Sequence, residues 1–214
     1  MIKRLIFDVD DTLIEWKEEY WDTLEDVFRE LNIQYNKELL NKVIKAIDTY
    51  EQENQYYNKE AMIEHINKVT DSNFNMKFLD YCLNAFGKCV PNKKDENLIE
   101  TLNYLSKKYE LVVLTNWFVE EQNCRLENFG IKCFFSKVFA SENFKVKPNK
   151  EAFKTAMEDN LPEECIMIGD SLKKDIQGAI NAGMKAIYLN ANLPKGKKEN
   201  YIVINKIEEL KNIL

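Results

Sequence analysis

The sequence predicts an α/β fold, in which helices cover both faces of a mainly parallel β-sheet, with an all-helical module inserted after the first strand. Beyond residue 88, short apolar runs alternate with stretches of helical periodicity, as expected for a parallel sheet. Between residues 15 and 86 there is no glycine or proline, and apolar residues recur at helical spacing. Polar residues directly follow several of the apolar runs, which is where open α/β sheets bind ligands.

Length and composition fit one domain with an insertion, or two small domains, with a substantial core. The chain has 214 residues, of which 45% are hydrophobic. Its net charge of −6 argues against binding to nucleic acid or to anionic membranes. No apolar run approaches the roughly 20 residues of a membrane span, and acidic residues soon follow the N-terminal Met-Ile-Lys-Arg, unlike a signal peptide. We therefore expect a cytoplasmic protein, monomeric by default, although the aromatic surface of the inserted helices could support a dimer.

The first strand is expected at residues 3–7, and four helices follow it. We expect these helices to form a module over residues 15–87, inserted into a core made of residues 1–14 and 88–214. Gly87 and Pro91 close the module. The apolar faces of the four helices are Trp16, Tyr20, Leu24, Val27 and Leu31; Leu39, Leu40, Val43, Ile44, Ile47 and Tyr50; Met62, Ile63, Ile66 and Val69; and Phe78, Leu79, Cys82, Leu83 and Phe86.

Helices and strands are expected to alternate after the module. Gly130 is a natural residue to end a helix, Asn149 a natural residue to begin one, and residues 195–200 are polar and loop-like. The expected helices are 98–105, 120–130, 149–157, 174–182 and 207–214, and the expected strands are 110–114, 137–140, 165–168, 185–189 and an edge strand at 201–204.

The cysteine and histidine content argues against zinc binding and thiol catalysis. There are five cysteines, none of them in a Cys-x-x-Cys pair, and the only histidine is His65, in a helical stretch. We expect the cysteines to be reduced structural thiols and His65 to be an ordinary helix residue.

The polar residues that follow the expected strands indicate a common site. The carboxyl ends of parallel strands lie on one edge of a sheet, so these residues can converge there. Clustered carboxylates without histidine suit a hard cation, above all Mg²⁺, and a lysine with a hydroxyl group can hold a phosphate. Each piece alone fits a turn or a helix cap, but their occurrence in order favours a site. The residues are Asp8 and Asp10, Thr115 and Asn116, Lys147, and Asp170 and Asp175.

The first two aspartates suggest the type of chemistry. A carboxylate such as Asp8 can act as a nucleophile and form an aspartyl-phosphate. Asp10 lies two residues further along, on the same side of an extended segment. It can therefore protonate a leaving oxygen and later activate water.

Four segments resemble motifs of the haloacid dehalogenase-like hydrolase superfamily, in its phosphatase branch, and the resemblance covers the whole chain. It implies a Rossmann-like three-layer sandwich with a C1-type helical cap inserted after the first strand. The segments are Asp8-Val9-Asp10-Asp11-Thr12-Leu13, Leu114-Thr115-Asn116, Lys147-Pro148-Asn149-Lys150-Glu151-Ala152-Phe153 and Gly169-Asp170-Ser171-Leu172-Lys173-Lys174-Asp175.

The resemblance also implies a role for each site residue. Asp8 would be the nucleophile and Asp10 the general acid and base. Mg²⁺ would be held by Asp8, the backbone carbonyl of Asp10, and Asp170, while Asp175 would support the metal or Lys147. The residues implied in phosphate binding are Thr115, Asn116 and Lys147.

The second aspartate favours hydrolysis of a phosphate ester over dehalogenation, because the dehalogenase branch lacks it. We expect a Mg²⁺-dependent phosphatase for a small phosphorylated metabolite, such as a nucleoside monophosphate, a sugar phosphate or a phosphoglycolate-type ester. A phosphomutase is the alternative, because it uses the same residues. A non-catalytic binding or regulatory module is disfavoured by the presence of Asp8, Asp10 and Asp170.

Two positions depart from the common pattern of the superfamily. Trp117 stands where related sequences often have glycine. It either packs in the core or against the cap, or it lines the leaving-group pocket and stacks on a flat group such as a nucleobase. The spacing before Lys147 is one residue shorter than usual, so Lys145 is an alternative phosphate ligand; Lys147 is favoured because it precedes Pro148.

Overall fold

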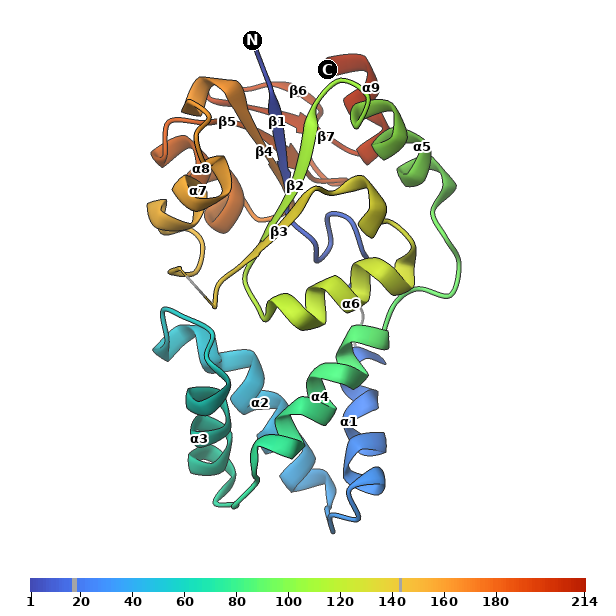
Figure 1. The fold of residues 1–214 in the computed structure, drawn as a ribbon, viewed down its shortest axis with the longest axis vertical. Coiled ribbons are helices and arrows are strands. Elements are labelled where there is room, and N and C mark those ends of the chain that lie inside the picture. The colour runs from blue at the N-terminus through green and yellow to red at the C-terminus, as the bar shows by residue number, and fades with distance from the viewer. Residues whose placement is uncertain (17–18, 143) are drawn as a thin grey trace.

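The structure is a computed structural model that describes residues 1–16, 19–142 and 144–214. A seven-stranded sheet forms the upper half of the molecule (Figure 1). The strand order is β3-β2-β1-β4-β5-β7-β6, and every pairing is parallel except that of β6 with β7. The strands are β1 (Arg4–Phe7), β2 (Glu110–Thr115), β3 (Lys137–Ala140), β4 (Cys165–Gly169), β5 (Lys185–Leu189), β6 (Gly196–Lys197) and β7 (Tyr201–Ile204).

Helices cover both faces of the sheet, as the alternation of buried side chains along β1 requires. Leu5 and Phe7 point to the face covered by α5, α6 and α9, whereas Ile6 points to the face covered by α7 and α8. The α/β sandwich predicted from the sequence is therefore confirmed. These helices are α5 (Glu96–Leu105), α6 (Val119–Phe129), α7 (Lys150–Met157), α8 (Gly178–Asn181) and α9 (Leu210–Ile213), with 3₁₀ turns η1 (Lys132–Phe134), η2 (Pro162–Glu164) and η4 (Ile207–Glu209).

Four helices between β1 and α5 form a separate layer below the sheet in Figure 1, here called the helical cap. Asn36 and Asn58 begin two of them, because their side chains accept hydrogen bonds from the backbone N–H groups three residues further on. The apolar faces of the four helices enclose a core of their own. This confirms the predicted helical insertion after the first strand. Its helices are α1 (Glu19–Glu30), α2 (Lys37–Glu53), α3 (Lys59–Thr70) and α4 (Met76–Lys88).

Two expected elements differ in detail, and part of a third lies outside the described residues. The strand β7 is not at the edge, because β6 pairs with it from a segment expected to be a loop; both β6 residues are exposed and give no apolar signal. The helix expected at 174–182 begins as the π-helical turn η3 (Leu172–Gln177), in which the backbone N–H of Ile176 bonds to the carbonyl of Ser171. The expected start of the first helix falls partly on residues 17–18, outside the described residues.

None of the helices in the described part of the chain is long and apolar enough to cross a membrane.

Candidate active site

The carboxyl ends of β1, β2 and β4 meet at the edge of the sheet that faces the helical cap. Phe7 at the end of β1 is paired with Val113 and Ile168, so the residues that follow these strands emerge at one level. A cavity of about 470 Å³ opens there, between the sheet and the cap. All eight site residues predicted from the sequence, Asp8, Asp10, Thr115, Asn116, Trp117, Lys147, Asp170 and Asp175, line this cavity.

Lys147 joins two buried carboxylates at the base of the cavity. Its Nζ donates hydrogen bonds of 2.6 Å to an oxygen of Asp8 and of 2.6 Å to an oxygen of Asp175. The lysine is only 3% exposed. Burial by itself would lower the pKa of Lys147, but Asp175 and Asp8 more than offset that effect and raise it above its usual value. Lys147 is therefore a permanent positive charge beside the predicted nucleophile.

The position of Lys147 also bears on the alternative lysine. Lys147 lines the cavity, whereas Lys145 is not among the described residues that line it. The geometry thus favours Lys147 as the phosphate ligand, as preferred from the sequence.

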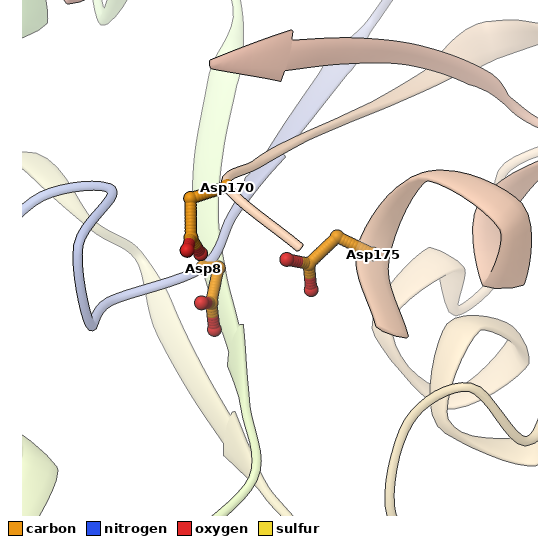
Figure 2. Close-up of side chains that lie close together, drawn as sticks. All are labelled: Asp8, Asp170 and Asp175. Carbon is orange, nitrogen blue, oxygen red and sulfur yellow. The ribbon is translucent and has the colours of Figure 1, made fainter. Parts of the chain in front are cut away.

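Three carboxylates lie close enough to share a cation. One oxygen from each of Asp8, Asp170 and Asp175 lies within 4.8 Å of the other two, and Figure 2 shows the side chains of all three converging. Burial raises the pKa of Asp8 to about 8 despite the opposing effect of Lys147, and burial together with Asp175 raises the pKa of Asp170 to about 6. The three carboxylates can carry more negative charge than Lys147 alone balances, and a donor set of carboxylate oxygens fits Mg²⁺.

The third carboxylate in this group belongs to Asp175, for which the resemblance implies support of the metal or of Lys147. The backbone carbonyl of Asp10, which the resemblance implies as a ligand, is not part of a grouping of side chains. Asp175 is fully buried, and its second oxygen accepts a hydrogen bond of 3.0 Å from the backbone N–H of Ser171. Gly169 permits this approach, because a Cβ at that position would lie 2.4 Å from the Asp175 carboxylate.

We expect the affinity for Mg²⁺ to rise as the pH increases from about 5 to about 8. Asp170 and Asp8, with pKa values of about 6 and about 8, hold protons at the lower end of this range, and a cation must displace them. For each proton that the cation must displace, the dissociation constant should fall by up to about tenfold for every unit by which the pH rises. Calorimetric titration with Mg²⁺ across this range measures the effect, and an affinity independent of pH would contradict it.

The side chain of Asp10 contacts helix α6. Its carboxylate pairs with the guanidinium of Arg125 and accepts a longer hydrogen bond of 3.4 Å from Gln122. Arg125 is 1% exposed, and its Nε lies 3.9 Å from the carboxylate of Glu121. That carboxylate in turn accepts a hydrogen bond of 3.1 Å from the hydroxyl of Tyr20. A chain of buried polar contacts thus connects α1 of the cap with the predicted acid and base.

Asn116 uses its side chain to fix other parts of the site. Its Oδ1 accepts hydrogen bonds from the backbone N–H of Lys147 at 2.8 Å and from the hydroxyl of Ser141 at 3.1 Å. Its Nδ2 donates a hydrogen bond of 2.6 Å to Glu51. The side chain therefore holds the main chain of Lys147 in place, while Thr115, 1% exposed, brings its hydroxyl to the end of β2.

Glu51 reaches from α2 of the cap onto the core. Besides Asn116, it binds Lys174 in a salt bridge of 3.0 Å. The backbone of the α2–α3 connection also pairs with the core, since the N–H of Tyr57 donates to the carbonyl of Ser141 at 2.8 Å. These contacts hold the cap against the cavity.

Sequence reasoning missed Glu51, Glu121 and Arg125. All three lie in helices with many charged residues, where a charged side chain usually faces solvent. The helical pattern does not reveal which part of a polar face meets the edge of the sheet. The spacing of Glu121 and Arg125, one helical turn apart, is common on exposed helix surfaces and gives no sign of burial.

Trp117 packs against neighbouring rings and also borders the cavity. Its ring packs against those of Tyr57 and Phe118, with centroid distances of 5.1 and 5.4 Å, and it also lines the cavity. Its backbone has a φ of 150°, a conformation that favours glycine. The tryptophan therefore adopts this conformation at an energetic cost.

Comparisons with known proteins agree with this geometry. Residues 5–189 match the family described as haloacid dehalogenase-like hydrolase. A glyceraldehyde 3-phosphate phosphatase of Methanothermobacter thermautotrophicus is 31% identical, and the match covers all of both chains. A pyrimidine 5′-nucleotidase of Streptococcus pneumoniae is 27% identical, over 88% of this chain and 84% of its own.

Solved structures share the fold. A HAD-hydrolase of Bacillus subtilis, YfnB, crystallised with magnesium, superposes with a TM-score of 0.73 at 22% identity, over 99% of this chain and 98% of its own. A 2-haloacid dehalogenase of Pseudomonas syringae superposes equally well, with a TM-score of 0.73 at 20% identity, over 100% of this chain and 98% of its own. At such identities the likeness establishes the fold alone.

Proposed function

The chain belongs to the haloacid dehalogenase-like hydrolase family, and from this membership and the geometry of its site we propose that it is a Mg²⁺-dependent phosphatase for a small phosphorylated metabolite. The observation that carries the proposal is the contact of Lys147 with both Asp8 and Asp175, beside Asp170. A buried carboxylate held next to a fixed cation is suited to attack a phosphoryl group that the same cation binds. Relatives that cleave a triose phosphate and pyrimidine nucleotides support the reaction class.

In the proposed first step, a carboxylate oxygen of Asp8 attacks phosphorus and the bond to the ester oxygen breaks. Lys147 and the Thr115 hydroxyl bind the non-bridging oxygens, and Asp10 donates its proton to the leaving oxygen. In the second step, water attacks the phosphorus of the aspartyl-phosphate while Asp10 accepts the proton, which releases phosphate and restores Asp8. Mg²⁺, held by Asp8, the Asp10 carbonyl and Asp170, with Asp175 close by, would supply the charge that brings these anions together.

The cap has a part in both steps. Its contacts through Glu51 and Tyr57 cover the cavity from the side opposite the sheet. A covered site excludes bulk water while the phosphoryl group is transferred, which strengthens the charge interactions at the reacting atoms.

The test of this proposal is a screen of phosphate monoesters in the presence of Mg²⁺, with the Asp8→Asn variant as the blank. We expect the wild-type protein to release free phosphate from an aryl phosphate and from at least one metabolite, and EDTA to stop the release. Release of phosphate without an isomerised product separates a phosphatase from a phosphomutase. No release above the blank from any ester would refute the proposal.

Arg125 is expected to position Asp10 for the first step. Replacement of Arg125 by Met leaves the Asp10 carboxylate without its buried partner, so the proton is delivered less well to the leaving oxygen. We expect kcat/KM for an alkyl phosphate to fall by about 10²-fold. An aryl phosphate with a strongly acidic phenol needs no proton and should lose much less.

A double-mutant comparison supplies the control for Arg125. In an Asp10→Asn background, the Arg125→Met change should cause little further loss, because the group it positions is already gone. Equal losses on alkyl and aryl esters, or additive losses in the double variant, would instead indicate a purely structural role.

A further inference from the structure

We propose that the leaving group accepted by this cavity bears a flat ring and no second anionic group, as in a nucleoside monophosphate. The inference rests on the proposed phosphatase function and narrows its substrate class. It disfavours phosphoglycolate-type esters and acidic sugar phosphates, in which a carboxylate accompanies the phosphate.

The first support is the balance of charge along the cavity wall. Beyond the four aspartates of the reacting centre, the described lining residues include the carboxylates of Asp11, Asp48 and Glu51. The cations among these lining residues are Lys147, which is held between Asp8 and Asp175, and Lys174, which is paired with Glu51. A second anion on the substrate would therefore meet no unpaired cation in the described lining and would be repelled by the carboxylates.

Glu51 is the main carboxylate in this repulsion of a second anion. It is held in place by Asn116 at 2.6 Å and Lys174 at 3.0 Å, so it does not swing freely into solvent. Its carboxylate can still accept hydrogen bonds, because an ionised carboxylate has about four acceptor positions. A hydroxyl or amino group of an uncharged leaving group fits this acceptor, and an anion does not.

The second support is the number of aromatic rings on the wall. One group comprises Trp16, Tyr20 and Trp21, whose ring centroids lie between 5.4 and 6.0 Å apart. The other consists of Tyr57 and Trp117, 5.1 Å apart. Rings that line a cavity provide surfaces on which a flat group can stack.

The size of the cavity fits a leaving group of this kind. The cavity, at about 470 Å³, is much larger than a two-carbon phosphate fills and lies in the range of small-molecule sites.

The experiment compares esters in matched pairs with the Mg²⁺-loaded protein. Glycerol 1-phosphate and 3-phosphoglycerate are both three-carbon esters, but the second has a carboxylate. Uridine 5′-monophosphate adds a ring and no further anion. We expect kcat/KM to be at least about tenfold higher for the nucleotide than for glycerol phosphate, and higher again than for phosphoglycerate.

Variants then assign the effect to named residues. Glu51→Gln removes the negative charge and releases Lys174, so phosphoglycerate should gain about tenfold relative to glycerol phosphate. Glu53→Gln, an equal change of charge on an exposed residue of the same helix, is the matched control and should leave that ratio unchanged. Trp117→Gly should lower the preference for the nucleotide over glycerol phosphate more than it lowers turnover of glycerol phosphate itself.

The outcomes separate the inference from the function on which it rests. Hydrolysis of an aryl phosphate above the Asp8→Asn blank, with phosphoglycerate or phosphoglycolate preferred over the nucleotide, overturns the inference alone. Equal ratios in Glu51→Gln and Glu53→Gln also overturn it. Absence of hydrolysis of every ester overturns the proposed function itself.

Discussion

Replacement of Asp8 by asparagine is expected to lower the release of phosphate from every substrate by a factor of about 10³ or more. The amide keeps the size of the side chain but is a poor nucleophile, so no aspartyl-phosphate can form. The measurement is steady-state release of phosphate from an aryl phosphate at saturating Mg²⁺.

The fold of this variant should remain intact. Lys147 keeps its hydrogen bond of 2.6 Å to Asp175, and the change removes one of the crowded carboxylates. Thermal unfolding without Mg²⁺ should therefore occur at the same temperature as in the wild type, or higher. Appreciable turnover by a well-folded Asp8→Asn protein would exclude Asp8 as the nucleophile.

Replacement of Lys147 by methionine is expected to reduce both activity and stability. The variant loses the cation that binds the phosphoryl group, so kcat/KM should fall by about 10²- to 10³-fold. It also leaves Asp8 and Asp175 without their shared partner inside the protein. Breaking such a buried pair costs about 3–5 kcal/mol.

The loss of stability should depend on pH in a defined direction. Burial raises the pKa of Asp8 to about 8, so Asp8 can take up a proton at low pH, which relieves its repulsion with Asp175. The free energy of unfolding of Lys147→Met should therefore fall further below that of the wild type at about pH 8 than at about pH 5. Chemical denaturation without Mg²⁺ at both pH values measures this difference.

Lys145→Met is the matched control, two residues away. Lys145 is half-buried and lies outside the described lining of the cavity, so its replacement should change stability by no more than about 0.5 kcal/mol and leave kcat/KM nearly unchanged. If the Lys145 variant lost activity and the Lys147 variant kept it, the assignment of the phosphate ligand would be reversed.

The order of elements could be predicted because each buried strand is a short apolar run bounded by polar or glycine residues. Residues 137–140 and 185–189 were expected as strands and are β3 and β5. The strand β6 could not be predicted, because two exposed residues in a polar segment join the sheet only through backbone hydrogen bonds to β7. Likewise, the π-helical form of η3 could not be predicted, because local propensity does not distinguish it from an α-helix.

Some features of the site could likewise be predicted from the sequence and others could not. Asp8, Lys147, Asp170 and Asp175 could be predicted to converge, because each follows a strand or precedes a helix at the same edge of the sheet. The partner of the Asp10 carboxylate could not be predicted. It is Arg125, a residue far along the chain, and the local sequence does not report a contact between such distant residues.

Formation of a phosphoryl bond on Asp8 is the central claim, and its direct measurement is mass spectrometry of rapidly quenched reactions. The wild-type protein, mixed with Mg²⁺ and a good substrate and then quenched in acid, should yield an N-terminal peptide that carries one phosphoryl group on Asp8. The Asp8→Asn protein should yield none. Rapid turnover of substrate with no phosphoryl group on Asp8 at any time, or with the group on another residue, would contradict the account.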